Sequence, residues 1–298
     1  MAAMPTPQPG LFAQGTRSHR HLEFDLRVGV EPSAVLRSLQ PLRQPSVAAG
    51  GTNIVIGFGT ATWSRLAGDD APVGLRPLSV PGIASISHDV WVWMHGAGDD
   101  VLLDAARAVC RLLDPVATLA SEVHGFVYRD SRDLTGFIDG TENPPVEEAY
   151  RVALVPNGEP GAGGSHALVQ RWVHALDRFE ALTVDDQEKV IGRTKADSVE
   201  LDDDVKPATA HIARVVIEDD RGNELEIYRR SVPYGTTAEH GLMFVAFAAD
   251  PTRPVKMLER MFGASGDGIR DQLTAFSTPV TGATYFVPSL EALGAALG

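Results

Sequence analysis

Cysteine is almost absent from this sequence. Cys110 is the one cysteine among 298 residues, so no disulfide bond can form within the chain. This composition fits a reducing compartment, in which thiols stay reduced. Cys110 falls in the apolar run 105–113, and we interpret it as a small buried hydrophobic residue rather than a reactive thiol.

Positive charge is scarce as well. The chain has 26 Lys and Arg residues against 39 Asp and Glu residues, which gives a formal net charge of −13. A nucleic-acid-binding protein needs a basic face to neutralise phosphates, and a protein that docks on anionic lipid needs a basic patch. We therefore expect neither nucleic acid nor a membrane surface as a partner.

Long apolar runs are also missing. The run Leu242–Ala249 is far shorter than the roughly 20 residues that a membrane-spanning helix needs. Residues 1–18 have neither a basic start with an apolar segment nor a twin-arginine pair, so we expect no secretion signal and a cytoplasmic location. Prolines at positions 5, 7 and 9 make residues 1–18 a predicted flexible arm.

Hydrophobic periodicity predicts a β-α-β-β-α-β order in the first half. Apolar and polar residues alternate over Leu22–Val30, which is the period of a strand. The following elements are a helix over Glu31–Leu42 with an early proline, strands at Asn53–Gly59 and Val90–His95, a helix over Val101–Leu113 that Asp99 or Asp100 caps, and a strand within Ser121–Tyr128. This order is typical of a split βαβ, or ferredoxin-like, unit.

The second half repeats a similar order. The expected elements are a strand at Ala167–His174, a helical region over Ala175–Ile191, a hairpin of His211–Ile217 with Leu225–Arg230, a strand at Leu242–Ala248, a helix over Pro254–Phe262 and a strand at Ala283–Val287. Loops rich in Gly and Pro separate the halves. We predict an α+β protein with the arm 1–18 and two ferredoxin-like lobes with antiparallel sheets, 19–145 and 146–298.

One segment between the predicted lobes concentrates polar residues. Residues 136–144, GFIDGTENP, combine two glycines with Asp139, Glu142 and Asn143. Glycine lets the backbone approach a ligand closely. On the residue types alone, Asp139 is either a turn former or an acid that faces a ligand.

The predicted hairpin carries a histidine and an arginine of interest. His211 begins an alternating strand on its apolar face, which suits a core residue or a ligand of a metal or heme iron. Alternation places Arg229 and Ser231 on one face of the second strand. Arg229 is then either a surface charge or a group that stabilises a developing anion in a pocket.

Other catalytic patterns are missing. The sequence has no Walker-type loop, no GxSxG and no HExxH, and its glycine cluster at 158–164 lacks the strand and helix of a dinucleotide site. His19 and His21 have a chelating spacing, but they adjoin the predicted arm. We expect Trp91, Trp93 and Trp172 to be core residues.

Taken together, these segments resemble the dye-decolourising peroxidases, a family of heme enzymes. Residues 136–140, GFIDG, match the family's GxxDG signature, and the extension 141–144 matches as well. Further similar blocks follow in order: Gln187–Arg193, His211–Val215, Arg229–Gly235, His240–Leu242, Phe276–Thr278 and Tyr285–Pro288. The resemblance runs from about residue 20 to about residue 290, and its compact loops are similar to the B-type, or primitive, class.

The resemblance implies a fold, a cofactor and a set of site residues. It implies two ferredoxin-like lobes of the dimeric α/β-barrel superfamily, with one heme b per chain in the C-terminal lobe. His211 is the implied proximal ligand of the iron, and Asp271 the carboxylate that bonds the imidazole. Asp139 and Arg229 form the implied distal catalytic pair.

Two further residues are implied to contact the cofactor. Arg214, three residues after His211, is expected at a heme propionate. Ser231 stands where many B-type members carry Asn, so it is an expected distal residue that departs from the usual pattern.

The implied function is reduction of hydrogen peroxide through an oxo-iron intermediate, with one-electron oxidation of dyes, phenolics or other donors. The resemblance also implies a homo-oligomer, and it leaves room for encapsulin as a partner. Two alternatives stay open. One is a chlorite-dismutase-like heme enzyme on a related fold, against which Asp139 argues; the other is a protein that carries heme or porphyrin.

Overall fold

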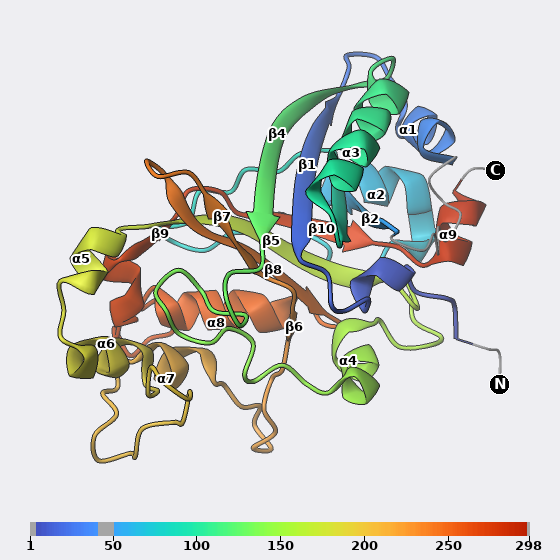
Figure 1. Cartoon of the computed structure of the whole chain (residues 1–298). Helices are drawn as coiled ribbons and strands as arrows, with labels where there is room; N and C mark the ends of the chain where they lie inside the picture. Colours follow the sequence, from blue (N-terminus) through green and yellow to red (C-terminus); the bar gives the residue numbers. More distant parts are fainter. Residues whose placement is uncertain (1–3, 41–50, 297–298) are drawn as a thin grey trace.

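A computed structural model describes residues 4–40 and 51–296 (Figure 1). Its strands are β1 Ser18–Leu26, β2 Asn53–Gly59, β3 Val90–Gly96, β4 Ala117–Phe126, β5 Ser165–His174, β6 Tyr228–Arg229, β7 Val232–Gly235, β8 His240–Ala248, β9 Ser277–Pro279 and β10 Ala283–Val287. Its α-helices are α1 Pro32–Leu39, α2 Thr60–Ala67, α3 Asp99–Leu113, α4 Val146–Ala153, α5 Leu176–Glu180, α6 Val184–Ile191, α7 His211–Val215, α8 Thr252–Met261 and α9 Leu290–Ala295.

The strands form one antiparallel sheet that closes on itself. Pairing runs from β8 through β7, β4, β1, β3, β2, β10 and β5, and β5 pairs with β8 again. The short strands β6 and β9 extend β8 and β5. The predicted α+β class with antiparallel strands is confirmed, and strands from both predicted lobes share this closed sheet. Closure leaves few unpaired strand edges.

Alternation along the strands separates the inside of the closed sheet from its outside. The inside holds a cluster that includes Trp91, Trp93, Phe247 and Tyr285, each at most 1% exposed. The expectation that Trp91 and Trp93 are core residues is confirmed. His19 and His21 are also buried here and stack on these tryptophans, so they do not form a chelating pair at the surface.

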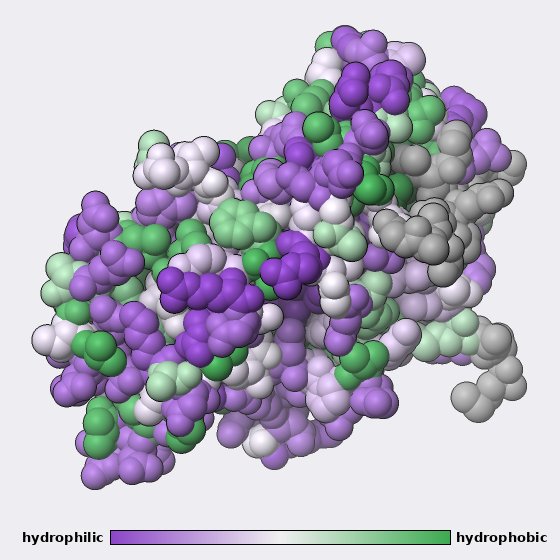
Figure 2. Space-filling model, viewed as in Figure 1, coloured by the Kyte–Doolittle hydropathy of each residue, from purple (hydrophilic) through white to green (hydrophobic). Residues whose placement is uncertain are grey.

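Helices cover two regions of the outer face. Helices α1, α2, α3 and α9 lie together at one end of the molecule, and α6, α7 and α8 lie together at the other (Figure 1). The face seen in Figure 2 is mainly hydrophilic, with apolar residues scattered over it. No helix in the described ranges is long and apolar enough to span a bilayer.

Most predicted elements are present, but several local predictions are wrong. Strand β1 ends at Leu26, because the chain turns at Gly29 (φ +80°) and leaves Val28 exposed. Gly98, not Asp99 or Asp100, is the N-cap of α3, and no side chain caps that end. The predicted helix continues to Leu42, but residues 41–50 lie outside the described ranges.

The segment around His211 is helix α7 rather than a strand. The alternation of His211, Ala213 and Val215 had suggested a period of two. In the helix, His211 and Val215 are four residues apart and line the same cavity, which is the spacing of one helical face. The second strand of the expected hairpin is reduced to the two residues of β6.

The described part of the expected flexible arm is packed against the sheet. The Gln8 amide donates to Ile56 O (2.8 Å) and Pro288 O (2.9 Å) and accepts from Ile56 N (2.8 Å). Leu11 is fully buried. Proline-rich composition predicted mobility, but these buried contacts fix the segment.

Candidate active site

An apolar cavity lies between the outer face of β5 and β8, helices α7 and α8, and the loop that carries Asp139. Its empty volume is about 1070 Å³. Most of its lining is apolar and includes Leu168, Trp172, Phe244, Met257, Leu258 and Met261. The polar side chains among its walls include Asp139, His211 and Arg229, so three residues singled out by sequence come together here.

Two glycines shape the loop that brings Asp139 into this cavity. Gly136 (φ +89°) and Gly140 (φ +78°) adopt left-handed conformations that are strained for other residues. The Asp139 N–H donates to Ser131 O (3.0 Å), and the Gly136 N–H donates to Asp133 O (2.9 Å). The GxxDG pattern therefore encodes a tight turn whose carboxylate faces the cavity.

Asn143 fastens the same loop to strand β6. Its amide donates to Arg229 O (2.8 Å) and accepts from Arg229 N (2.8 Å). This two-bond pairing fixes the Arg229 backbone beside the Asp139 loop. Asn143 stands in the motif, but the sequence did not indicate its role. The available signal was an Asn that ends a glycine turn before Pro144.

Burial and charge act on Asp139 in opposite directions. Burial raises the pKa of Asp139, and the positive charge of Arg229 opposes that shift. The neighbouring carboxylate of Asp133 adds to the rise, while the Gly140 N–H and His211 reduce it. The net pKa is above its ordinary value, which favours a carboxyl group that can hold and release a proton.

The Arg229 guanidinium has no protein partner in the described structure. It makes no side-chain hydrogen bond within residues 4–40 and 51–296, and its Nε is buried without a partner. A guanidinium without a partner beside an apolar cavity is available to an anionic ligand.

His211 is held by a buried carboxylate. Its Nδ1 lies 2.7 Å from Asp271 Oδ2, and the Asp271 side chain is fully buried. Asp271 also begins the short 3₁₀ helix Gln272–Ala275, where its Oδ1 accepts from Leu273 N (2.8 Å). A carboxylate only accepts, so Nδ1 carries the proton and Nε2 keeps a free lone pair, as a metal ligand requires.

Arg214 lies away from the cavity. Its guanidinium is 3% exposed and bonds Arg260 O (3.2 Å) and Asp267 Oδ2 (2.8 Å). Arg260 lies in the last turn of α8 and Asp267 in the loop after it, and Arg214 is not among the residues that line the cavity. The structure therefore does not bring Arg214 to the position that the resemblance implied.

Ser231 lies on the other side of Asp139. Its Oγ accepts from Val245 N (3.2 Å), and it lines a polar cleft that Asp139 and Arg229 also line. Arg132 and Arg230 add positive charge to this cleft. Asp139 and Arg229 thus lie between the apolar cavity and the polar cleft.

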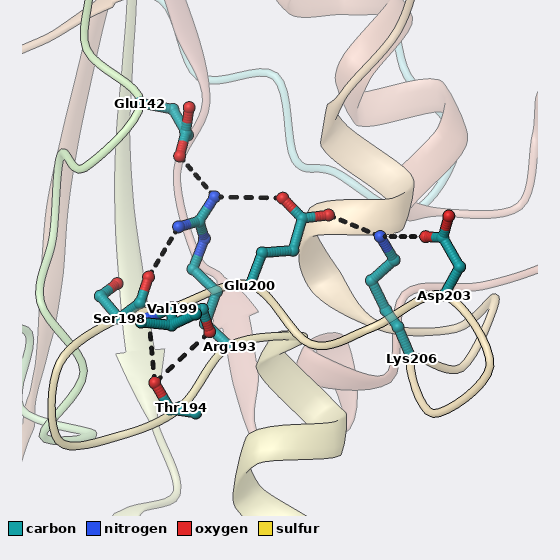
Figure 3. Close-up of polar contacts among 8 residues, drawn as sticks. All are labelled: Glu142, Arg193, Thr194, Ser198, Val199, Glu200, Asp203 and Lys206. Atoms are coloured by element: carbon teal, nitrogen blue, oxygen red, sulfur yellow. Dashed lines mark hydrogen bonds and ion pairs between the residues drawn. The ribbon is translucent and has the colours of Figure 1, made fainter.

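A network of charged groups supports a further wall of the site (Figure 3). Arg193 pairs with Glu142, beside the Asp139 loop, and with Glu200 (3.5 Å). Lys206 pairs with Glu200 (2.5 Å) and Asp203 (2.9 Å). The network ties the loop after α6 to the GxxDG extension.

The lining fits a heme. A flat apolar macrocycle needs an apolar slot, its iron needs an imidazole nitrogen, and its propionates need polar partners. The cavity supplies the apolar walls and His211, and Arg229 leaves Nε without a partner. The buried Gln170 amide on the same wall has no protein partner at either atom.

Comparisons with known proteins agree with this geometry. Family models described as Dyp-type peroxidase match residues 45–127 (N-terminal) and 130–292 (C-terminal). A dye-decolorizing peroxidase of Rhodococcus erythropolis is 36% identical and covers 98% of this chain and 89% of its own. One of Mycobacterium tuberculosis is 35% identical and covers 81% and 74%.

Solved structures show the same fold. A putative Dyp-type peroxidase of Shewanella oneidensis superposes with a TM-score of 0.91 at 34% identity and covers 98% of each chain. A variant of DypB from Rhodococcus jostii RHA1, solved in complex with heme, has a TM-score of 0.90 at 33% identity and covers 99% of this chain and all of its own. The chain belongs to the Dyp-type peroxidase family.

Proposed function

We propose that His211, Asp271, Asp139 and Arg229 carry out peroxide reduction in the apolar cavity, with one heme b as cofactor. As a family member, the protein is a heme-dependent peroxidase. One observation supports these residue roles above the others: a histidine with a buried carboxylate partner lines the same cavity as a buried Asp and an unpartnered Arg. When bound, the heme supplies the redox chemistry.

His211 holds the cofactor in this proposal. Asp271 keeps the proton on Nδ1, which directs the Nε2 lone pair toward the iron and raises the basicity of the ligand. A more basic imidazole favours the higher oxidation states that a peroxidase uses. Asp271 is therefore a positioning residue that acts through His211.

Asp139 moves the proton. Hydrogen peroxide must lose a proton from one oxygen and gain one on the other before its O–O bond breaks to release water. The buried Asp139 carboxylate accepts the first proton and returns it to the departing oxygen, directly or through a water molecule. Because its pKa is raised, Asp139 binds and releases a proton at a pH closer to neutral than an ordinary Asp does.

Arg229 stabilises the charge. Negative charge accumulates on the departing oxygen as the O–O bond lengthens, and the guanidinium has no protein partner that competes for it. The polar cleft that reaches Asp139 and Arg229 offers peroxide and water a route that does not cross the apolar cavity.

Stopped-flow absorption of the heme-loaded protein tests these roles. We expect one equivalent of hydrogen peroxide to change the Soret band rapidly in the wild type. Asp139→Ala should slow that change by about 10²–10⁴-fold, and Arg229→Ala by about 10²–10³-fold, with heme retained in both.

Two results would contradict the assignment. Variants that react as fast as the wild type would remove Asp139 and Arg229 from the mechanism. A wild-type protein that binds heme but ignores peroxide, and gives its heme readily to apomyoglobin, would instead be a heme carrier.

The reducing donor is proposed to be a dye, a phenolic compound or another one-electron donor, as the names of the relatives suggest. A homo-oligomer, a cytoplasmic location and an encapsulin partner stay predictions from the resemblance. Light scattering during size-exclusion chromatography of the heme-loaded protein tests the first of these.

A further inference from the structure

A buried polar cluster lies beneath the Asp139 loop, and the mechanism above does not use it. His174 Nε2 lies 3.1 Å from Asp133 Oδ1, and His174 Nδ1 lies 2.8 Å from Ser277 Oγ. The other oxygen of Asp133 accepts from Thr135 N (2.9 Å) and Thr135 Oγ1 (2.6 Å). All four residues line the apolar cavity.

The cluster joins three parts of the fold. Asp133 and Thr135 belong to the loop that leads to Asp139, His174 ends β5, and Ser277 begins β9 opposite it in the sheet. The side chains of His174 and Asp133 are 6% and 16% exposed. Charged pairs in such surroundings are retained only where their hydrogen bonds are satisfied.

The hydrogen-bond pattern tolerates either charge state of His174. Asp133 only accepts, so Nε2 carries a proton. A neutral His174 then accepts the Ser277 hydroxyl proton at Nδ1, and a cationic His174 donates to the Ser277 oxygen instead. Because the Ser277 hydroxyl can rotate, the hydrogen bonds of His174 to Ser277 and Asp133 are kept in both charge states.

Backbone hydrogen bonds join the two arms of the turn that carries Asp133 and Asp139. The Asp133 N–H donates to Phe137 O (2.9 Å), and the Asp139 N–H donates to Ser131 O (3.0 Å). Asp133 and Asp139 thus lie on opposite arms of one tight turn, Asp133 bonded to Phe137 and Asp139 to Ser131. A shift of Asp133 away from His174 would move the Asp139 carboxyl within the cavity.

The cluster also fixes a charge close to Asp139. Burial raises the pKa of Asp133, but bonds and charge from His174, with the bonds from Thr135, more than offset it and leave the pKa below its ordinary value. Asp133 is therefore a carboxylate, and its charge adds to the rise in the pKa of Asp139, which Arg229 and His211 oppose.

We propose that Asp133, His174 and Ser277 form a positioning cluster that holds the Asp139 loop on the sheet and keeps a carboxylate on the same cavity wall as Asp139. None of the three touches peroxide in this proposal. The proposal rests on the proposed role of Asp139 as the group that moves the proton.

Two variants separate the charge of the cluster from its geometry. Asp133→Asn removes the charge and keeps an acceptor for His174, so the acidic limb of the pH profile of the peroxide rate constant should move to lower pH. His174→Gln breaks the link to the sheet, so hydrogen exchange of residues 131–140 in the holoenzyme should rise about tenfold or more, as expected for loss of a charged hydrogen bond. His166→Gln, a buried histidine on the same strand, is the matched control and should change neither quantity.

A double-mutant cycle decides whether the cluster acts through Asp139. In an Asp139→Asn background, Asp133→Asn should have little further effect on the peroxide rate constant. If Asp133→Asn changed the peroxide rate constant as much in that background as in the wild type, the proposal would be overturned. An unchanged pH profile in Asp133→Asn together with unchanged exchange in His174→Gln would also overturn it. If the wild type does not react with peroxide, the proposed function fails, and the exchange measurement still decides on the positioning.

Discussion

At the scale of single residues, the partner of each polar side chain decides its role. Two arginines were expected at the heme, and their hydrogen-bond partners in the structure differ. Arg214 bonds Arg260 O and Asp267 through Nε and Nη2, whereas Arg229 has a buried Nε without a partner. Arg229 also lines the cavity and Arg214 does not, so Arg229 fits the site, and Arg214 links α7 to α8.

Heme affinity depends on His211 and its carboxylate. We expect His211→Ala to abolish tight heme binding, because the described cavity offers no other imidazole in its place except His174, which Asp133 and Ser277 occupy. Asp271→Asn should weaken binding by about 10–100-fold. Titration of the apo-protein with heme, followed by absorption, measures both, with His240→Ala as a control outside the cavity. Unchanged affinity in His211→Ala would remove it as the ligand.

The pH dependence of the peroxide reaction reports on Asp139. Its pKa is raised, so the base form should be lost, and the rate should fall, at a pH above the range of an ordinary Asp. Arg229 lowers that pKa, so Arg229→Gln should move the acidic limb to higher pH as well as reduce the maximum rate. Stopped-flow rate constants between pH 4 and 8 test this; a limb that moves to lower pH would contradict the assignment.

At the scale of elements, the site is made where short irregular segments meet the regular sheet. Asn143 fixes β6 to the Asp139 loop, and β6 itself has only two residues. Helix α7 is one turn long and is held by its packing against α8, because so short a helix has little stability of its own. These segments depend on their neighbours more than on local sequence preference.

Strands β1 and β3 place three histidines inside the closed sheet in a neutral state. Burial lowers the pKa of His19 to about 3 and that of His95 to about 2, and it lowers the pKa of His21 well below its ordinary value. The unfolded chain binds protons at these sites below about pH 6.5 while the folded chain does not. Folding stability should therefore fall as the pH falls from about 6.5 toward 3.

Substitution tests this effect. His21 has no hydrogen-bond partner at either ring nitrogen in the described structure, so His21→Phe should reduce the loss of stability between pH 7.5 and pH 5. One histidine can account for at most about 1.4 kcal/mol of this loss of folding stability per pH unit. Urea unfolding at both pH values measures it, with the partly exposed His124 replaced by Phe as the control. An equal loss in His21→Phe would show that this histidine does not contribute.

At the scale of the whole molecule, closure of the sheet joins the two halves of the chain, and the cavity lies against the outer face of β5 and β8. The halves meet at β4 with β7 and at β2 with β10, and these pairings are short: Tyr285 and Phe286 alone register with β2. The closed sheet provides the rigid wall on which the cavity is built. Asp139 and Arg229 stand where the apolar cavity, the polar cleft and a third, acid-lined cavity meet.

Gln8 reinforces the join between β2 and β10. Its amide bonds Ile56 in β2 and Pro288, the residue after β10. Gln8→Ala removes these bonds and leaves their backbone partners buried without them, so it should destabilise the protein by about 2–4 kcal/mol. Urea unfolding measures the change, and Gln14→Ala, at an exposed position nearby, should leave stability within about 0.5 kcal/mol. Equal stability of the two variants would contradict this role.

The sequence by itself determined most of the long strands, the apolar interior and the residues of the motif, because periodicity and glycine turns are local properties. It identified Asp139, His211, Arg229 and Asp271, which the structure gathers around one cavity or pairs directly.

Tertiary structure alone decided the rest. The strands of the two expected sheets form one closed sheet, and the His211 segment is a helix. Arg214 bonds Asp267 and does not line the cavity, and Asp133 bonds His174. Each of these features depends on contacts between residues far apart in the chain, and local periodicity cannot predict such contacts.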